Sequence, residues 1–332
     1  MGVGRERHCF RGEASEMTIR WIALVAIVAL VSSTANAASR LPVRTDGGMV
    51  VSVSELSSRV GVEILNEGGN AIDAAVAVAF SLAVTWPSAG NLGGGGFMVI
   101  YLADEQRATA IDYREMAPRR AHRDMYLDAE GNVIDGGPTD GHLSVAVPGT
   151  VAGLIYAQEK YGKLPLQTVI APAIAQAEDG FLVGDYLEAS LERARERLAG
   201  HPESARLFLK DGGRFLAGER MVQPELAATL KRIAERGREG FYAGRTADLL
   251  IAEMKRGGGL IDRTDLAEYT PRERTPVQGS YRGYDIVSMP PPSSGGTILI
   301  EMLNMMEPLN VAELGLLSSD QVHNVVAAMK RA

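Results

Sequence analysis

Apolar residues recur at helical spacing near the start of the predicted fold. Within residues 54–67, Leu56, Val60 and Ile64 follow one another every four positions, which places them on one face of a helix. The glycines at positions 68 and 69 end the pattern, because glycine commonly terminates helices. We therefore predict a helix over residues 54–67 with one apolar face.

The next segment, residues 71–84, is apolar nearly all round. A helix without a polar face is buried in a globular protein, so we predict a core helix here. Asn70 is expected to cap its N-terminus. Asp73 falls in its first turn, where a negative charge is favourable.

Four further segments combine apolar residues at helical spacing with a terminal glycine, the residue that most often adopts the left-handed conformation at a helix end. They make the middle of the chain mostly helical and cover residues 149–160, 166–179, 223–236 and 246–256. The terminal glycines are Gly162, Gly180, Gly237 and Gly257.

Strands are predicted on either side of this helical middle. They are residues 49–53, 97–102 and 108–113, and a hairpin of residues 276–281 and 284–289 around Arg282-Gly283. The proline run at 290–292 predicts an extended approach and a tight turn, followed by a helix over residues 297–307. This order suggests an α+β fold in which helices enclose a sheet and strands distant in sequence pair.

The N-terminus has the three-part form of a secretory signal peptide. Residues 17–20 form a short positive segment, residues 21–31 an apolar run of 11 residues, and residues 35–37 read Ala-Asn-Ala. A membrane anchor is the alternative, but a spanning helix needs about 20 apolar residues, and polar residues 32–34 interrupt too early. We expect export to the periplasm or the medium, with cleavage near Ala37.

Charge argues against nucleic acid as a partner. The first 37 residues hold four of the 34 Lys+Arg and three of the 41 Asp+Glu, so residues 38–332 carry a net charge of 30 − 38 = −8. A negative chain without a basic cluster is poorly suited to neutralising phosphates.

Thiol chemistry and metal binding are also disfavoured. The only cysteine, Cys9, lies before the predicted cleavage site, so the mature chain would have neither a disulfide nor a thiolate ligand. No two histidines have metal-ligand spacing; they are His8, His122, His142, His201 and His323. We predict no cofactor and no metal.

The glycine run 93–96 invites comparison with a phosphate-binding loop. Such a loop ends in Gly-Lys-Ser/Thr and opens a helix, whereas this run has no lysine and leads into the predicted strand 97–102. Two interpretations remain: a tight turn that needs positive φ, or a close approach of the backbone to a ligand or a partner segment.

Arg114, directly after the predicted strand 108–113, is the candidate ligand-binding residue. Its planar guanidinium can donate two parallel hydrogen bonds to a carboxylate. Because Asp112 and Glu115 flank it, a structural ion pair is the alternative role. The serines at 293 and 294 lack a Gly-x-Ser-x-Gly elbow and a histidine partner, so a rigid turn is favoured over a nucleophile there.

Several segments together resemble the γ-glutamyltranspeptidase (glutathione hydrolase) family. The order and approximate spacing agree from about Thr45 to the end of the chain. The segments are 66–75 (NEGGNAIDAA), 90–98 (GNLGGGGFM), 112–118 (DYREMAP), 147–153 (VPGTVAG), 281–284 (YRGY) and 289–296 (MPPPSSGG).

The resemblance implies an N-terminal-nucleophile hydrolase with an αββα sandwich. Such a precursor cleaves itself into a large and a small subunit, and the N-terminal threonine of the small subunit is the nucleophile, with its own amine as base. Backbone amides stabilise the oxyanion. The γ-glutamyl group, usually from glutathione, passes to water or to an amino acid or peptide. Arg114 matches the family arginine that holds the donor α-carboxylate, and Glu115 is expected to help position it.

The chain departs from the family pattern in one respect. The nucleophilic segment Thr-Thr-His-x-Ser does not occur in its 332 residues. We therefore expect residues 1–37 to be an upstream extension and signal peptide, and residues 38–332 to be a large-subunit region, with the nucleophile beyond Ala332. Alone, it should be inactive and poorly soluble, because the two subunits would share sheets.

Two alternatives keep part of this interpretation. One is a related acylase of the same superfamily that acts on glutaryl side chains; Arg114 within Asp-Tyr-Arg-Glu favours γ-glutamyl instead. The other is a non-catalytic truncated product that acts as a scaffold, although no interaction motif supports it.

Overall fold

The computed structural model describes residues 42–210 and 213–332. Residues Gly48–Ala332 form one compact unit, and the described residues before it, 42–47, contain neither helix nor strand. The predicted signal peptide and its cleavage site at Ala37 lie outside the described residues. Within the described ranges, no helix has both the length and the apolar character that a membrane crossing requires.

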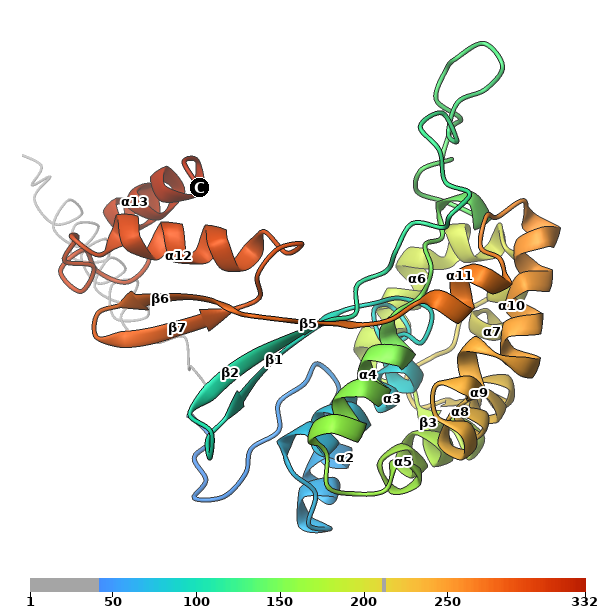
Figure 1. Cartoon of the computed structure of the whole chain (residues 1–332), viewed down its shortest axis with the longest axis horizontal. Coiled ribbons are helices and arrows are strands. Elements are labelled where there is room, and N and C mark those ends of the chain that lie inside the picture. The colour runs from blue at the N-terminus through green and yellow to red at the C-terminus, as the bar shows by residue number, and fades with distance from the viewer. Residues whose placement is uncertain (1–41, 211–212) are drawn as a thin grey trace, which may run out of the picture. The chain divides into compact units, whose positions relative to one another are not determined.

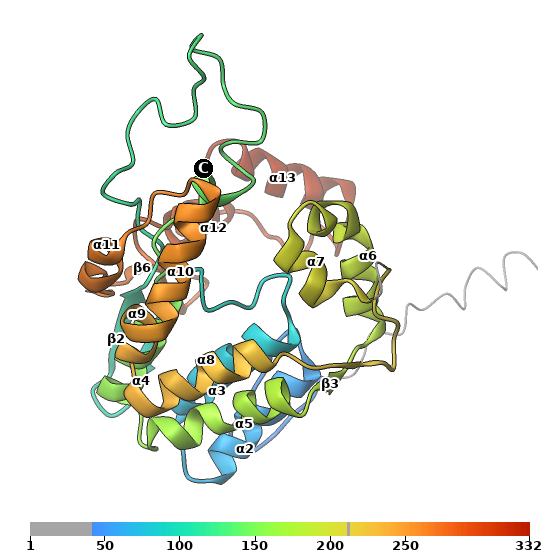
Figure 2. The same ribbon diagram turned by 90° about the vertical axis from the view of Figure 1, so that its right-hand side faces the viewer.

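A cluster of helices forms the main core (Figure 2). Helix α2 (Glu55–Asn66) packs on α3 (Ala71–Thr85), α3 packs on α4 (Thr150–Tyr161) and α5 (Leu166–Glu178), and α5 packs on α8 (Pro224–Arg236). The core helix predicted at residues 71–84 is confirmed, since most of α3 is buried. Fully buried side chains at its centre include Ile64, Phe80, Ile170 and Leu230.

The start of α3 is held by the predicted cap and by a contact that the sequence did not reveal. Asn70 Oδ1 accepts hydrogen bonds from the backbone N–H groups of Ile72 and Asp73, and the Asp73 carboxylate accepts one from the Asn70 N–H. Asp73, fully buried, also accepts a hydrogen bond from the N–H of Lys163 at 2.9 Å. This one carboxylate therefore joins α3 to the chain that follows α4.

The other predicted helices are confirmed with shifts of one or two residues at their ends. Helices α4, α5, α8 and α10 (Gly244–Gly257) occupy the predicted segments. The sequence reading did not identify α6 (Asp185–Ala199), α7 (Pro202–Phe208), α9 (Glu239–Tyr242), α11 (Arg263–Glu268) and α13 (Ser319–Met329), nor the short helix η1 (His142–Ser144).

The helix-ending glycines differ in conformation. Gly180 has positive φ, as expected, whereas Gly237 has φ 55° and ψ −135°, which lies outside the left-handed helical region but still favours glycine. Gly257 lies inside α10, and Gly258 takes the left-handed conformation instead. Gly162 has φ −75°, so its conformation does not require glycine. A Cβ there would lie 2.5 Å from the Asp73 carboxylate, so the close approach of the two segments explains this residue.

The strands belong to separate small sheets. Strand β2 (Arg107–Asp112) pairs antiparallel with β1 (Phe97–Leu102) and with β5 (Arg272–Arg274), which confirms the expected pairing of strands distant in sequence. Strands β3 (Phe181–Leu182) and β4 (Arg220–Met221) form a second pair. The predicted hairpin is confirmed as β6 (Val277–Tyr281) and β7 (Tyr284–Ser288), and α12 (Gly295–Met306) packs on it (Figure 1).

One predicted strand is wrong. Residues 49–53 form no strand, and Val51 and Val53 are largely exposed. In this segment the N–H of Ser52 donates to Ser58 Oγ, and the hydroxyl of Ser52 donates to the carbonyl of Ser54. β-Branched composition alone did not supply a pairing partner. The chain is thus a mixed α+β structure, and the complete αββα sandwich stays a prediction for the whole protein.

Candidate functional site

Arg114 lies two residues beyond the end of β2, with an exposed side chain. It lines a hollow of about 330 Å³ between the segment 112–116, β5 with the residues before it, and the turn that precedes α12. The lining residues are Asp112, Arg114, Glu115, Met116, Tyr269, Thr270, Arg272, Arg274 and Pro292. The structure therefore brings Asp-Tyr-Arg-Glu and the proline turn, which are distant in sequence, to one place.

Asp112 does not pair with the guanidinium of Arg114. Its carboxylate, which is buried, accepts a hydrogen bond from Arg274 Nε at 2.7 Å and another from the backbone N–H of Arg114 at 3.1 Å. Within the described residues, the Arg114 side chain forms no hydrogen bond or ion pair, and neither Asp112 nor Glu115 neutralises it. The ion-pair alternative thus finds no support, and the guanidinium is available to a ligand.

The backbone around Arg114 is held from two sides. The hydroxyl of Tyr269, a buried residue, donates to the Arg114 carbonyl at 2.8 Å. Met116 and Val147 form an antiparallel bridge, at which the long connection between them leaves and rejoins the fold (Figure 1). Burial raises the pKa of Tyr269, so its hydroxyl stays protonated and able to donate. Arg114 therefore presents a free side chain on a restrained backbone.

The glycine run packs directly against this segment. Gly96 and Tyr113 exchange backbone hydrogen bonds of 3.3 and 3.1 Å, and a Cβ on Gly95 would lie 2.7 Å from the backbone N of Glu115. None of glycines 93–96 has positive φ, so the tight-turn interpretation is wrong for them. The close-approach interpretation is correct for Gly95 and Gly96, and their partner is the segment that carries Arg114.

Two further glycines, at the start of α4, accommodate the ring and carbonyl of Tyr113. A Cβ on Gly149 would lie 2.1 Å from the Tyr113 carbonyl oxygen, and one on Gly153 would lie 2.2 Å from Cγ of the ring. The N–H groups of Gly149 and Thr150 donate to the Gly94 carbonyl, which joins α4 to the glycine run. Burial raises the pKa of Tyr113 to about 12. These close contacts explain the glycines at 95, 96, 149 and 153.

The proline turn contributes Pro292 to the hollow and no nucleophile. The predicted turn is confirmed, since the N–H of Ser293 donates to the Pro290 carbonyl at 3.1 Å. Ser293 Oγ accepts a hydrogen bond from the Gly295 N–H, and in the described part of the chain no histidine hydrogen-bonds to Ser293 or Ser294.

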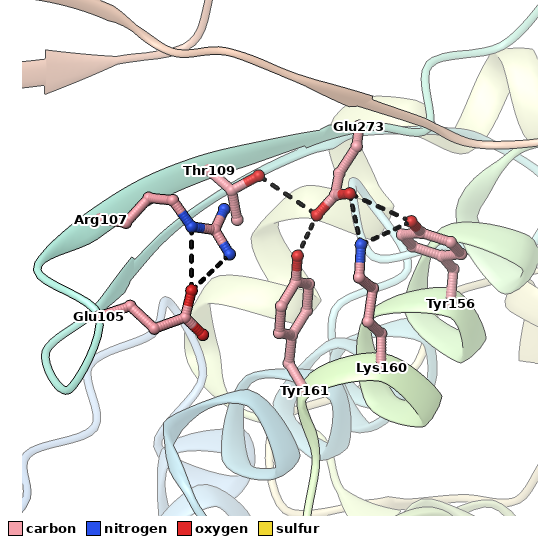
Figure 3. Close-up of polar contacts among 7 residues, drawn as sticks. All are labelled: Glu105, Arg107, Thr109, Tyr156, Lys160, Tyr161 and Glu273. Carbon is pink, nitrogen blue, oxygen red and sulfur yellow. Dashed lines mark hydrogen bonds and ion pairs between the residues drawn. The ribbon is translucent and has the colours of Figure 1, made fainter.

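The opposite face of β5 is tied to α4 through Glu273 (Figure 3). Its carboxylate accepts hydrogen bonds from Lys160, Tyr156 and Tyr161 of α4 and, at 3.3 Å, from Thr109 of β2. The hydrogen bond from Lys160 raises the pKa of that lysine. Side chains alternate between the two faces of a strand. Because Glu273 faces α4, the residues on either side of it, Arg272 and Arg274, face the hollow.

The sequence did not point to four residues that line the hollow: Tyr269, Thr270, Arg272 and Arg274. The available signal was Arg-Glu-Arg in a short extended segment, which predicts two arginines on one face. The partner strand could not be read from local sequence, since Asp112 and Arg274 are 162 positions apart. Among the described residues, no cluster of three or more His, Cys, Asp or Glu side chains could hold a metal ion.

Known proteins resemble this chain in sequence and in fold. The Gamma-glutamyltranspeptidase family model matches residues 57–332. The Glutathione hydrolase proenzyme of Pseudomonas sp. (strain A14) is 49% identical over 299 residues, which cover 90% of this chain and 52% of that protein. The Acylase ACY 1 proenzyme of Pseudomonas sp. (strain V22) is 41% identical over 295 residues, which cover 87% of this chain and 53% of that protein.

Structural comparison agrees. The crystal structure of Helicobacter pylori gamma-glutamyltranspeptidase superimposes with a TM-score of 0.85 at 45% identity, covering 87% of this chain and 83% of that one. The chain spans about half the length of the curated relatives that it matches. The family match, the close relatives and the shared fold confirm the resemblance seen in the sequence: this chain belongs to the gamma-glutamyltranspeptidase family, as a large-subunit-like portion.

Proposed function

We propose that this chain is the donor-binding part of a γ-glutamyltransferase and glutathione hydrolase, and that Arg114 binds the α-carboxylate of the γ-glutamyl donor. The observation that carries the proposal is an exposed guanidinium that has no partner among the described residues, in a hollow and on a backbone held by Asp112 and Tyr269. A restrained backbone reduces the conformational entropy that ligand binding costs. A bidentate pair with a carboxylate also fixes the ligand's direction.

The rest of the reaction would use residues outside this chain. A self-cleaved precursor would expose a threonine at the start of a small subunit, which would complete the αββα sandwich and attack the γ-glutamyl carbonyl. The carbonyl carbon would bond to the threonine oxygen, and the C–N bond to the leaving amine would break. Water would then release glutamate, or an amino acid or peptide amine would accept the γ-glutamyl group.

Arg114→Ala and Arg114→Lys in the full-length, processed protein test this role. A hydrogen bond to a charged group contributes about 1.5–3 kcal/mol, so Arg114→Ala should raise the KM for the donor at least about tenfold. Lysine cannot form the forked pair and should restore little of the loss. Arg120→Ala is the matched control, because Arg120 is exposed nearby but does not line the hollow. Unchanged donor kinetics in both Arg114 variants would refute the assignment.

The glutaryl acylase is the second candidate, because a relative with the name acylase is 41% identical. Glutaryl and γ-glutamyl groups both offer a carboxylate to Arg114, but only the γ-glutamyl group carries an ammonium. Glu115 lines the hollow and forms no ion pair among the described residues, so a negative charge is available to that ammonium. Turnover of matched γ-glutamyl and glutaryl anilides separates the candidates: faster turnover of the glutaryl compound would favour the acylase.

Export is part of the same proposal. The positive segment, apolar run and small residues before Ala38 support cleavage by a signal peptidase. N-terminal sequencing of the mature protein should begin at Ala38, and a mature N-terminus upstream of residue 21 would contradict export by this route.

A further inference from the structure

We propose that Arg272 binds a second carboxylate of the donor, on the leaving-group side of the scissile amide. The enzyme would therefore select γ-glutamyl peptides, whose leaving group ends in a carboxylate, over γ-glutamyl amides of uncharged amines. This inference rests on the proposed function, because it assigns a second subsite to the hollow that holds Arg114.

The pairing of β5 with β2 determines where Arg272 lies. Arg272 is opposite Asp112 in the antiparallel register, and Arg274 is opposite Ala110. Glu273, between the two arginines, is bound to α4 on the other face. Both arginines accordingly line the hollow, and Glu273 does not.

The two arginines of β5 differ in their partners. Arg274 donates to the buried carboxylate of Asp112 and is partly buried itself. Within residues 42–210 and 213–332, the Arg272 side chain forms no hydrogen bond or ion pair, and it is exposed. Because Asp112 already pairs with Arg274, it does not neutralise Arg272. Arg274 thus has a structural role, whereas Arg272 is free to bind a ligand.

The charges that line the hollow match a particular ligand chemistry. After the Asp112–Arg274 pair is set aside, the hollow keeps the guanidinium groups of Arg114 and Arg272, which have no partner in the described part of the chain, together with the carboxylate of Glu115. A γ-glutamyl peptide offers two carboxylates and one ammonium, which is the complementary set. A γ-glutamyl amide of an uncharged amine offers one carboxylate and leaves a guanidinium unpaired.

The test uses two γ-glutamyl anilides that differ only in a ring carboxylate on the leaving group. In the full-length, processed protein, Arg272→Gln should lower kcat/KM for the carboxylated anilide about tenfold or more relative to the plain anilide. Arg272→Lys should restore part of that preference, since it keeps the charge. Arg120→Gln is the matched control, and its ratio of the two kcat/KM values should equal that of the unsubstituted protein.

Each result bears on a different claim. An unchanged ratio in Arg272→Gln, with both anilides still turned over, would overturn the second subsite and leave the proposed function intact. If the unsubstituted protein turned over neither anilide, the proposed function would fail and this inference with it. Higher salt should reduce the preference for the carboxylated anilide in the unsubstituted protein more than in Arg272→Gln, because the interaction is between charges.

Discussion

A single added methyl group in the glycine run should displace Arg114. In Gly95→Ala, the new Cβ would lie 2.7 Å from the backbone N of Glu115 and from the carbonyl oxygen of Tyr113. Ordinary van der Waals contact begins at 3.4 Å, so the two backbone segments must separate by about 0.7 Å. Both neighbours are main-chain atoms, which cannot rotate away as a flexible side chain can.

The displacement should affect both stability and function. Overpacking of a close contact costs about 1–3 kcal/mol in folding free energy. A shift approaching 1 Å at a substrate-positioning residue can lower activity by about 10²-fold. We therefore expect Gly95→Ala to lower the urea midpoint and to raise the donor KM, because Arg114 lies between the two contacted residues.

Gly93→Ala is the matched control in the same run. A Cβ on Gly93 meets nothing within 4 Å, and Gly93 does not have positive φ. Both variants are compared in the full-length, processed protein by urea unfolding and by donor kinetics. If Gly95→Ala and Gly93→Ala gave the same midpoint and the same KM, the close-approach explanation of the glycine run would be wrong.

Two further predictions concern the contacts around the site. Tyr269→Phe removes the hydrogen bond to the Arg114 carbonyl, so it should cost about 1 kcal/mol of folding free energy and raise the donor KM; an unchanged KM would show that this bond does not position Arg114. Burial tends to raise the pKa of Glu273, but hydrogen bonds from Lys160 and Tyr161 leave it below the usual 4.5. The stabilisation from this carboxylate is therefore present above pH 4.5 and lost as pH falls through the folded-state pKa. The urea midpoint should fall more below pH 4.5 in the unsubstituted protein than in Glu273→Gln, and parallel pH profiles would contradict this.

Local patterns predicted seven of the twelve α-helices among the described residues, because the causes of those helices are local. The spacing of Leu56, Val60 and Ile64 and the cap at Asn70 each lie within one helix or its first turn. The strand predictions were less accurate, because a strand needs a pairing partner that the local sequence does not identify. Residues 49–53 have strand-like composition and yet form no strand, and the N–H of Ser52 bonds to the hydroxyl of Ser58 instead.

Arg114 was identifiable because guanidinium chemistry and the surrounding motif both pointed to it. The flanking residues did not show whether the guanidinium of Arg114 forms an ion pair. Asp112, two positions away, was a plausible ion-pair partner, but it binds Arg274 from a strand far along the chain. Only the pairing of β2 with β5 distinguishes a bound guanidinium from a free one.

The amino-acid sequence by itself determined seven of the described helices, the hairpin around Arg282-Gly283, the family and the candidate Arg114. Tertiary structure decided why positions 95 and 96 require glycine, which carboxylate neutralises which arginine, and that Arg272 shares the hollow with Arg114. The physical reason is the range of the interactions: periodicity, capping and turn chemistry act over a few residues. Steric contacts and ion pairs act between atoms that only the folded backbone brings together.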